Sequence, residues 1–368
     1  MISQFFDYNV SQFLLSDYRQ RAIEWDPMQL HRRRRRQSKN RTPLVVAALI
    51  VLAAAIFIGR SAVFSSRQSD GSAASQAGTA SYEGQASVEP TSTATPSPTP
   101  TATPVPPPVK NTNAPLPSVS AVSAVAIDDK SGAVLYEKNP HLQRAPASIT
   151  KIVTAIVAIE HANPSDLVTV RYDASELVDS TLMGVNPGDK LTLEDLLYGL
   201  MLPSGNEAAV AIANHVAGSE QAFVDLMNEK MKDLGLTDSH FANPHGLDAK
   251  GHYSSAYDMA MIARYGMRYP LFRQLAAAKV HTVNVWRATN GEKQSYDIYN
   301  LNKLLSIYPG ADGVKIGFTE NAWRTIVGTA VRNGHRVYVA LMGSNDLWTD
   351  TPRVLDYIFK NFSWPADN

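Results

Sequence analysis

An uninterrupted apolar segment at residues 43–59, PLVVAALIVLAAAIFIG, separates parts of this chain that cannot share one hydrophobic core. As a helix, its 17 residues would span roughly 25 Å, the short end of the hydrocarbon thickness of a bilayer. The span can continue to residue 64, because Arg60 can reach the membrane surface along its own methylene groups. The long lead before the segment, and the lack of a small-x-small site after it, argue against a cleaved signal peptide. We therefore predict a transmembrane anchor at residues 43–64.

Residues 1–42 form a basic tail, with nine Lys and Arg against four Asp and Glu and an unbroken arginine run at 32–36. Positive charge next to a membrane span stays on the cytoplasmic side. The sequence thus predicts a single-pass protein of the cell membrane, with a cytoplasmic N-terminus and an extracytoplasmic remainder.

Residues 65–114 form a low-complexity segment of Ser, Thr, Ala, Gly and Pro, and ten of the chain's 22 prolines fall between Pro90 and Pro117. Such a composition offers too little apolar surface to offset the entropy lost when a chain becomes ordered. We predict a disordered, partly polyproline linker that holds the following domain away from the membrane. A glycosylated stalk would have the same composition.

The remaining segment, residues 115–368, has a globular composition and enough length for one large core. The chain carries 34 basic and 34 acidic residues, so it lacks the basic excess that is typical of nucleic-acid binders. It has no cysteine, which excludes disulfides, thiolate metal ligands and a cysteine nucleophile. Strand-like runs at both ends with helix patterns between them predict an α+β domain, in which helices flank an antiparallel sheet made from N- and C-terminal strands.

Local patterns locate individual elements of this domain. Residues 123–129 and 132–138 read as two strands around Lys130-Ser131, which indicates a hairpin. A second hairpin is predicted where Asn333-Gly334 separates two β-rich runs, because this dipeptide favours the tightest hairpin turn. Apolar periodicity predicts helices at residues 148–162, 193–202, 206–217, 221–235 and 351–362.

Ser148 and Lys151 are the first residues that could carry chemistry. Three positions apart at the start of a predicted helix, they lie on one face, so the amine can approach the hydroxyl. A serine becomes a useful nucleophile when a base removes its proton, and a desolvated lysine with a lowered pKa can do this. The pair alone is weak evidence, because an N-cap serine followed by a surface lysine is common. The apolar residues around Lys151 favour the catalytic interpretation.

Two further short motifs follow along the chain. Ser204-Gly-Asn206 precedes a predicted helix and is explained as an N-cap turn, as a loop that aims a hydroxyl and an amide at a substrate and at Lys151, or as both together. Lys315-Ile-Gly317 lies in a strand-like run. Its cation can hold a carboxylate, and a glycine in a strand permits the close approach of a ligand or another backbone.

In this order, the three motifs resemble the signature of the penicillin-interacting serine enzymes. The resemblance extends from about residue 118 to 362 through APASITKIVTA, MLPSGNEAAVAIA, FVDLMNEKMKDLGLTDSHFANPHGLD, GHYSSAYDMAMIAR and DGVKIGFT. This region is similar to the bacterial D-alanyl-D-alanine carboxypeptidases, the low-molecular-mass penicillin-binding proteins. The resemblance implies a β-lactamase/transpeptidase-like fold and a serine D,D-carboxypeptidase domain at residues 115–368.

The resemblance also implies a role for each motif residue. Ser148 would be the acylated nucleophile, with its own backbone N–H as one donor of the oxyanion hole, and Lys151 would be its general base. Ser204 and Asn206 would complete the proton relay and hold the peptide.

The third motif would bind substrate. Lys315 would hold the terminal carboxylate beside Gly317, and the backbone N–H of Phe318 would complete the oxyanion hole. This chain departs from the family at Ile316, where a threonine hydroxyl usually contacts the carboxylate; we expect the nearby Thr319 to be the candidate replacement.

A second departure is Ala322-Trp323, where the family tends to have Ala-Gly. We expect both departures to alter specificity or rate without abolishing activity, because all the reactive side chains are present. Many relatives add a β-rich second domain and a C-terminal membrane helix. Neither is expected here, where the N-terminal span and the linker would anchor the domain.

The resemblance implies an enzyme that removes the terminal D-alanine from peptidoglycan stem pentapeptides and is acylated by β-lactam antibiotics. A D,D-endopeptidase that cuts existing cross-links would use the same residues, so the motifs leave both activities open. A β-lactamase is disfavoured, since no segment resembles the glutamate-containing loop of those enzymes. A non-catalytic wall-binding module is the alternative from another functional class.

We predict neither a metal site nor an organic cofactor. A metal interpretation of Asp238, His240, His245 and Asp248 is possible, but the family segment SHFANPHGLD accounts for these residues, and no HExxH pattern is present. A structural or substrate-proximal role is therefore expected for them.

Overall fold

The computed structural model of the protein describes residues 105–172 and 180–365. The predicted cytoplasmic tail, the predicted transmembrane anchor and most of the predicted linker lie outside these residues. Within them, no helix is both long and apolar enough to cross a bilayer.

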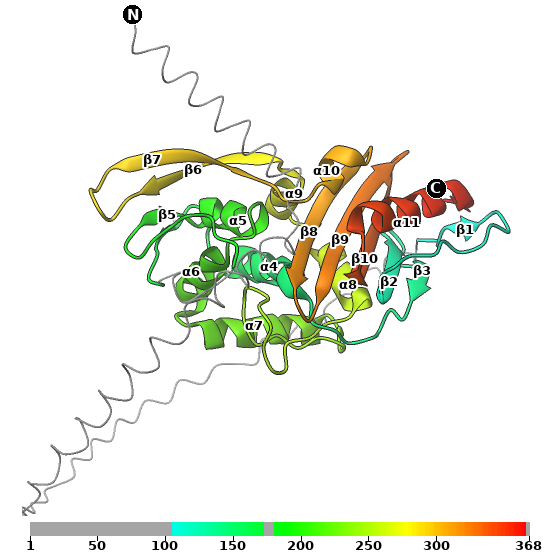
Figure 1. Cartoon of the computed structure of the whole chain (residues 1–368), viewed down its shortest axis with the longest axis horizontal. Coiled ribbons are helices and arrows are strands. Elements are labelled where there is room, and N and C mark those ends of the chain that lie inside the picture. Colours follow the sequence, from blue (N-terminus) through cyan, green and yellow to red (C-terminus); the bar gives the residue numbers. More distant parts are fainter. Residues whose placement is uncertain (1–104, 173–179, 366–368) are drawn as a thin grey trace, which may run out of the picture. The chain divides into compact units, whose positions relative to one another are not determined.

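A five-stranded antiparallel sheet runs through the described domain (Figure 1). In spatial order its strands are β3 (Val134–Lys138), β2 (Ser123–Asp128), β10 (His335–Ser344), β9 (Trp323–Arg332) and β8 (Ala311–Thr319). β2 pairs with β10, with Asp128 opposite Val337 and Ser123 opposite Met342. The prediction that N- and C-terminal strands share one sheet is therefore confirmed.

Both predicted hairpins are present in this sheet. β2 pairs antiparallel with β3, and β9 with β10. Between the latter two, Asn333 and Gly334 have φ values of 53° and 79°. Two consecutive left-handed residues are what a two-residue type I′ turn requires, which explains why the Asn-Gly signal is so specific.

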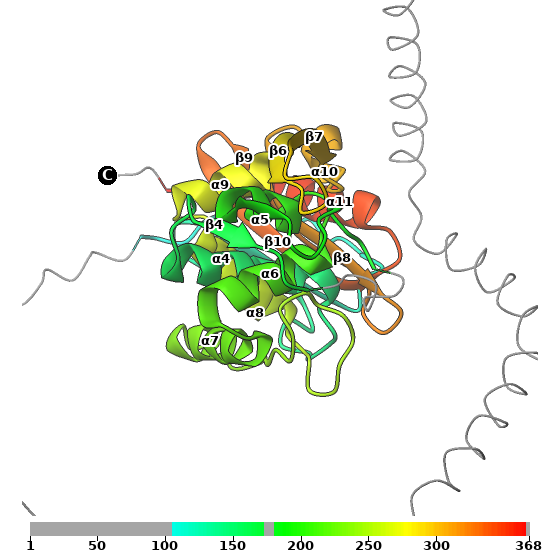
Figure 2. The same ribbon diagram turned by 90° about the vertical axis from the view of Figure 1, so that its left-hand side faces the viewer.

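Helices cover both faces of the five-stranded sheet (Figures 1 and 2). One face packs against α8 (Ala256–Gly266) and α9 (Pro270–Ala277). The other face packs against α10 (Leu304–Ile307) and α11 (Leu347–Asn361). The centres of β9 and β10 are buried without alternation, as expected for strands that are covered on both sides.

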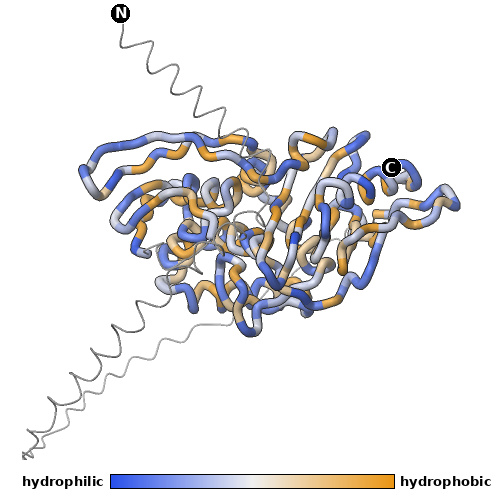
Figure 3. Tube along the Cα trace, viewed as in Figure 1, coloured by the Kyte–Doolittle hydropathy of each residue, from blue (hydrophilic) through white to orange (hydrophobic). Residues whose placement is uncertain are grey.

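The helix α4 (Lys151–His161) lies at the centre of the helical part of the domain (Figure 2). It contacts α8 and α9, together with α5 (Leu193–Met201), α6 (Asn206–Ala217) and α7 (Glu220–Asp233). Its first eight residues are all buried, which its apolar sequence allows. Hydrophobic residues gather on the inner strands and helices, whereas the tip of the β6–β7 hairpin is hydrophilic (Figure 3).

Most predicted helix boundaries agree with the structure within two residues, but two helices differ in an informative way. The helix predicted at 148–162 opens with a separate 3-10 turn, η1 (Ala147–Thr150), before α4 begins. The last helix starts at Leu347 and not at residue 351, because the side chain of Asp346 caps it by accepting hydrogen bonds from the amides of Trp348 and Thr349. The predicted start was therefore wrong by about one turn.

A second, four-stranded sheet was not predicted. It consists of β4 (Leu167–Thr169), β5 (Lys190–Thr192), β6 (Val280–Trp286) and β7 (Lys293–Tyr299). β6 and β7 form a long hairpin beside α5 (Figure 1). Contacts of Asp195 on α5 with the Nε2 atom of His281, at 2.8 Å, and with the amide of Asn284 hold the hairpin against the helix.

Ordered pairing begins before residue 115, the expected start of the domain. β1 (Val109–Lys110) pairs antiparallel with β11 (Phe362–Ser363) at the C-terminal end of α11. The amide of Asn111 also donates to the carbonyl of Asn361 at 2.9 Å. The folded domain therefore includes residues 109–114, which the composition had assigned to the linker.

Candidate active site

Ser148 lies in the turn η1, directly after a residue with a strained backbone. Ala147 has a φ of 54°, in the left-handed region that non-glycine residues rarely adopt. The hydroxyl of Thr325 on β9 donates to the carbonyl of Pro146 at 2.9 Å and ties the turn to the sheet. Strain of this kind persists only where surrounding contacts impose it, and it gathers at functional sites. The turn therefore presents Ser148 in one fixed position.

Two glycines allow other backbone segments to approach this turn closely. A Cβ atom at Gly317 would lie 2.6 Å from the amide nitrogen of Ser148, and one at Gly246 would lie 2.1 Å from the carbonyl oxygen of Ala147. Side chains at either position would clash with backbone, so only glycine fits. The amide of Ser148 thus lies against β8, the edge strand of the sheet and the strand that carries Phe318.

Lys151 is fully buried, and its amine lies among three oxygen atoms. Its Nζ atom is 3.1 Å from the hydroxyl of Ser148, 2.5 Å from Oδ1 of Asn206 and 2.6 Å from the carbonyl oxygen of His245. The structure therefore brings together three of the four residues to which the sequence assigns catalysis, and adds a backbone carbonyl from a distant segment.

The surroundings of Lys151 favour its neutral form. Burial lowers its pKa well below the ordinary value, and the nearby charge of Lys315 lowers that pKa further, against a smaller opposing effect of Glu207. A neutral amine has two protons and one lone pair. Its protons can be donated to the two nearer oxygens, of Asn206 and His245, which leaves the lone pair to accept the proton of Ser148.

Ser204 and Asn206 lie on either side of Gly205, where α6 begins. Gly205 is the N-cap of this helix, without a side-chain cap, so the motif does form an N-cap turn. The side chain of Asn206 also contacts Lys151, so both explanations of the motif hold together. Ser204 has a φ of 65°, and its buried hydroxyl forms no hydrogen bond with any described residue. A buried hydroxyl without a hydrogen-bond partner lowers the stability of the folded state, and a bound ligand can supply the missing partner.

Lys315 is a second buried amine, on β8. It is 1% exposed, and within the described ranges its only hydrogen bond is with the carbonyl of Ile316, at 3.2 Å. Burial lowers its pKa to about 7. A carboxylate next to this amine would favour the charged form again, so the position is suited to hold an anionic end of a substrate.

Ile316 and Thr319 lie on the same strand as this amine. Ile316 pairs with Ile326 of β9 and adds no hydroxyl to the site. The hydroxyl of Thr319 donates to Oδ1 of Asp248 at 2.8 Å and accepts from the amide of Ala322 at 3.0 Å. Its proton is therefore engaged, and Thr319 could replace the missing hydroxyl only if the bond with Asp248 breaks.

Trp323 is part of an aromatic edge where β8 turns into β9. Its ring centre is 6.0 Å from that of Phe318, and the guanidinium of Arg324 lies 5.5 Å from the indole centre. The indole N–H donates to the side chain of Asn345 at 3.2 Å. Both departures from the family pattern thus lie on the strand pair that borders the site.

The segment with the clustered histidines packs against the site through its backbone. Besides the contact of its carbonyl with Lys151, His245 has a buried imidazole whose pKa falls to about 3, so the ring is neutral at physiological pH. Asp238 contacts His141, and Nδ1 of His240 contacts the carbonyl of Gly251. In the part of the chain that the structure describes, no group of three His, Asp or Glu side chains is arranged to hold a metal ion.

Glu207 is a site residue that our sequence analysis missed. It is fully buried next to Asn206, and its Oε1 atom accepts from the amides of Met183, at 2.6 Å, and Gly184, at 2.8 Å. Its Oε2 atom has no hydrogen-bond partner among the described residues, and burial raises its pKa. The available signal was a lone acid inside the apolar helix sequence NEAAVAIA.

Comparison with known proteins agrees with this geometry. The sequence profile of the peptidase S11 family, described as D-alanyl-D-alanine carboxypeptidase, matches residues 109–346. The chain belongs to this family. It is a family of serine-type enzymes, and the match spans all three motifs.

Curated relatives and solved structures agree with the family assignment. The D-alanyl-D-alanine carboxypeptidase DacF of Bacillus subtilis is 35% identical over 250 residues, which cover 66% of this chain and 63% of that protein. The relative DacB2 of Mycobacterium tuberculosis is 34% identical over 255 residues, covering 67% of this chain and 85% of its own length. The crystal structure of the Streptomyces K15 DD-transpeptidase has 31% identity and a TM-score of 0.64, and the match covers 67% of this chain and all of that one.

These matches confirm a transpeptidase-like α+β fold for the described domain. The matched region spans only 57–63% of the length of several bacterial family members, among them DacF of Bacillus subtilis and DacA of Escherichia coli.

Proposed function

We propose that this protein is a membrane-anchored serine D,D-carboxypeptidase that removes the terminal D-alanine from peptidoglycan stem pentapeptides. The observation that carries the proposal is the position of a buried, pKa-lowered amine, that of Lys151, 3.1 Å from the hydroxyl of Ser148. A surface lysine at this spacing would keep its proton and could not act as a base. Membership of the carboxypeptidase family supports the same activity.

The reaction would proceed through an ester on Ser148. Its hydroxyl oxygen attacks the carbonyl carbon of the D-Ala-D-Ala bond while Lys151 takes the hydroxyl proton. The backbone amides of Ser148 and Phe318 would stabilise the negative charge on the carbonyl oxygen. The C–N bond then breaks, and D-alanine leaves after its nitrogen has received the proton. Water attacks the ester, its proton returns through Lys151, and the shortened peptide and free Ser148 are restored.

Lys315 and Ser204 would bind the part of the substrate that leaves. The terminal carboxylate of the peptide would lie at the amine of Lys315, with the unpaired hydroxyl of Ser204 close to the chain. β-Lactams carry a carboxylate and an acylating carbonyl, so they would enter the same position and form a long-lived ester with Ser148.

A D,D-endopeptidase is the second candidate, because the same residues would serve to cut an existing cross-link. A non-catalytic module is disfavoured because the Lys151 amine, the Ser148 hydroxyl and the Asn206 amide, from the first two motifs, lie within hydrogen-bonding distance.

The proposed location rests on the sequence. The apolar segment at 43–64 would cross the cell membrane, the arginine-rich tail would stay in the cytoplasm, and the catalytic domain would lie outside the membrane at the end of the linker. The wall is the place where both candidate substrates occur.

The test uses the purified full-length chain in detergent and its Ser148→Ala variant. Each is incubated with diacetyl-L-Lys-D-Ala-D-Ala, and released D-alanine is measured. Release by the wild type alone would establish the carboxypeptidase. Labelling of Ser148 by a fluorescent penicillin without release would favour the endopeptidase, to be tested next on cross-linked dimeric muropeptides. A folded chain that neither releases D-alanine nor is labelled would refute both.

A further inference from the structure

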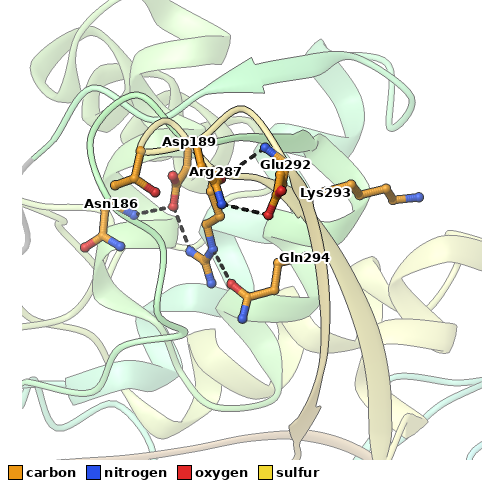
Figure 4. Close-up of a pocket in the computed structure, with 8 residues that line it drawn as sticks. Asn186, Asp189, Arg287, Glu292, Lys293 and Gln294 are labelled. Atoms are coloured by element: carbon orange, nitrogen blue, oxygen red, sulfur yellow. Dashed lines mark hydrogen bonds and ion pairs between the residues drawn. The ribbon is translucent and has the colours of Figure 1, made fainter.

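A polar pocket lies at the tip of the β6–β7 hairpin (Figure 4), and none of the residues that line it is one of the predicted catalytic residues. It has a volume of about 450 Å³, and every side chain that lines it is charged, amide or hydroxyl. This volume is within the range of roughly 300–1,000 Å³ that is typical of small-molecule sites. The lining excludes an apolar ligand, so any occupant would be recognised through hydrogen bonds.

The wall of the pocket is held rigidly by Asp189. This residue is 1% exposed, and its carboxylate accepts from the amide of Ala288 at 2.9 Å, the amide of Asn186 at 3.0 Å and Nη1 of Arg287 at 2.7 Å. Together these bonds keep its pKa low despite burial. A buried, fully satisfied ion pair fixes the geometry of the groups around it, so the pocket is formed before any ligand binds.

The charges of the lining cancel. The lining holds two acids, Asp189 and Glu292, and two bases, Arg287 and Lys293, although the Lys293 side chain points away from the others in Figure 4. Arg287 is paired with Asp189, and the amine of Lys293 lies 5.3 Å from the ring centre of Trp286. A phosphate site needs uncompensated cations, and a cation site needs uncompensated carboxylates. The balance therefore favours a neutral ligand.

Three carboxamides line the pocket, those of Asn186, Asn290 and Gln294. The Asn290 side chain is engaged with Glu292, because its amide nitrogen donates to the Glu292 carboxylate at 2.9 Å and its oxygen accepts from the Glu292 backbone amide at 3.0 Å. The other two carboxamides can contact a ligand. Oε1 of Gln294 accepts from Nε of Arg287 at 2.7 Å, which orients the Gln294 amide. The side-chain nitrogen of Gln294, and the side-chain oxygen and nitrogen of Asn186, form no hydrogen bond with the residues described. An amide offers donors and an acceptor side by side, which suits neighbouring hydroxyls and acetamido groups.

The pocket shares a chain segment with the active site. Nη1 of Arg287 donates to the carbonyl of Gly184 at 2.9 Å, and the amide of the same Gly184 donates to Glu207. Glu207 is next to Asn206, which holds Lys151. The segment from 184 to 189 thus has the pocket on one side and the support of the catalytic amine on the other.

From the volume, the balanced charge and the two available amides, we propose that this pocket binds the N-acetylated sugar units of a glycan strand. The inference rests on the proposed function only for the source of the glycan, which would be the peptidoglycan that carries the stem peptides. The pocket would hold the strand on the segment next to the catalytic residues.

The experiment measures the binding of the β-1,4-linked tetramer of N-acetylglucosamine to the full-length chain by titration calorimetry. We expect saturable, one-to-one binding, also in the Ser148→Ala variant. In Gln294→Ala we expect about threefold to tenfold weaker binding, as for the loss of one neutral hydrogen bond, and a larger loss in the double variant Asn186→Ala/Gln294→Ala. Gln274→Ala, an exposed glutamine on α9, is the matched control and should bind like the wild type.

Penicillin labelling of the same samples separates this inference from the proposed function. The double variant should be labelled like the wild type, because neither residue belongs to the catalytic site. The inference is overturned if a wild-type sample that reacts with penicillin does not bind the tetramer. It is also overturned if the double variant binds the tetramer as tightly as the wild type, or if inorganic phosphate competes with the tetramer. If labelling fails but the double variant still weakens tetramer binding, the sugar site stands and the proposed enzyme does not.

Discussion

Two buried amines, those of Lys151 and Lys315, should set the pH dependence of acylation. Lys151 acts as a base only when neutral, so acylation should be lost as the pH falls through its lowered pKa. Lys315 binds a carboxylate only when charged, so acylation by carboxylate-bearing ligands should also be lost as the pH rises above about 7, its pKa in the free enzyme. The two effects give a bell-shaped profile.

Replacing Lys315 tests this profile. In Lys315→Met the alkaline limb should disappear together with carboxylate binding, and the acidic limb should move to higher pH, because a like charge no longer depresses the pKa of Lys151. The measurement is the second-order rate constant of labelling by a fluorescent penicillin between pH 4 and 10. Lys190→Met, an exposed lysine on β5, should keep the wild-type profile. An alkaline limb that persists unchanged in Lys315→Met would show that another group causes it.

Ile316 should limit the hydrolysis of carboxylate-terminated peptides. Ile316→Thr restores a hydroxyl beside Lys315, and a hydrogen bond to a charged group contributes about 1–3 kcal/mol. We therefore expect kcat/KM for diacetyl-L-Lys-D-Ala-D-Ala to rise about fivefold to hundredfold. Ile316→Val is the control, because it shortens the side chain without adding the hydroxyl. Equal rates for the two variants would mean that the hydroxyl has no role in this chain.

Among the elements, the contact between β8 and η1 would assemble the proposed oxyanion hole. Gly317→Ala would place a methyl group 2.6 Å from the amide of Ser148, so we expect penicillin labelling to slow at least about hundredfold, as when an oxyanion donor is lost. Gly334→Ala is the matched control, because its site in the β9–β10 turn is open but its φ is 79°. It should cost about 1–2 kcal/mol of stability and leave labelling intact. Unchanged labelling in Gly317→Ala together with slowed labelling in Gly334→Ala would rule out this role of Gly317.

Elements with a strong local signal were predictable, whereas those defined by a partner were not. The turn at Asn333-Gly334 and the helix α6 agree with the prediction, because dihedral preference and apolar period act within a few residues. The hairpin of β6 and β7 carries many exposed polar residues and has weak alternation. Its position is set by contacts of Asp195 with His281 and Asn284, which no local pattern reveals.

At the scale of the whole molecule, both ends of the described chain are fastened to the domain. β1 pairs with β11, and the hydroxyl of Thr112 donates to the side chain of Asn361. The indole of Trp364 donates to Asp128 at 2.6 Å and stacks on His335 at 4.7 Å. These contacts make residues 109–114 part of the fold, directly before the point where the domain was expected to begin.

A truncation series tests this boundary. A fragment of residues 115–368 loses β1 and its hydrogen bonds, so we expect it to be about 1–3 kcal/mol less stable than the fragment 105–368. For a domain of this size that corresponds to a Tm lower by roughly 2–10 °C, measured by thermal unfolding followed by circular dichroism. Penicillin labelling at 25 °C should be the same in both fragments. Equal Tm values would place the boundary at residue 115 after all.

The family, the α+β class and the candidate catalytic residues Ser148, Lys151 and Asn206 could be predicted from the sequence, because each motif lies within a few consecutive residues. The contacts among these residues depend on the tertiary structure. Lys151 meets Asn206 and the carbonyl of His245 across 55 and 94 residues of chain, and burial of that amine is what lowers its pKa. The contacts of Glu207 and the position of the β6–β7 hairpin also depend on the tertiary structure. Contacts between residues so far apart in the chain follow from the packing of whole elements, and a local sequence pattern does not predict them.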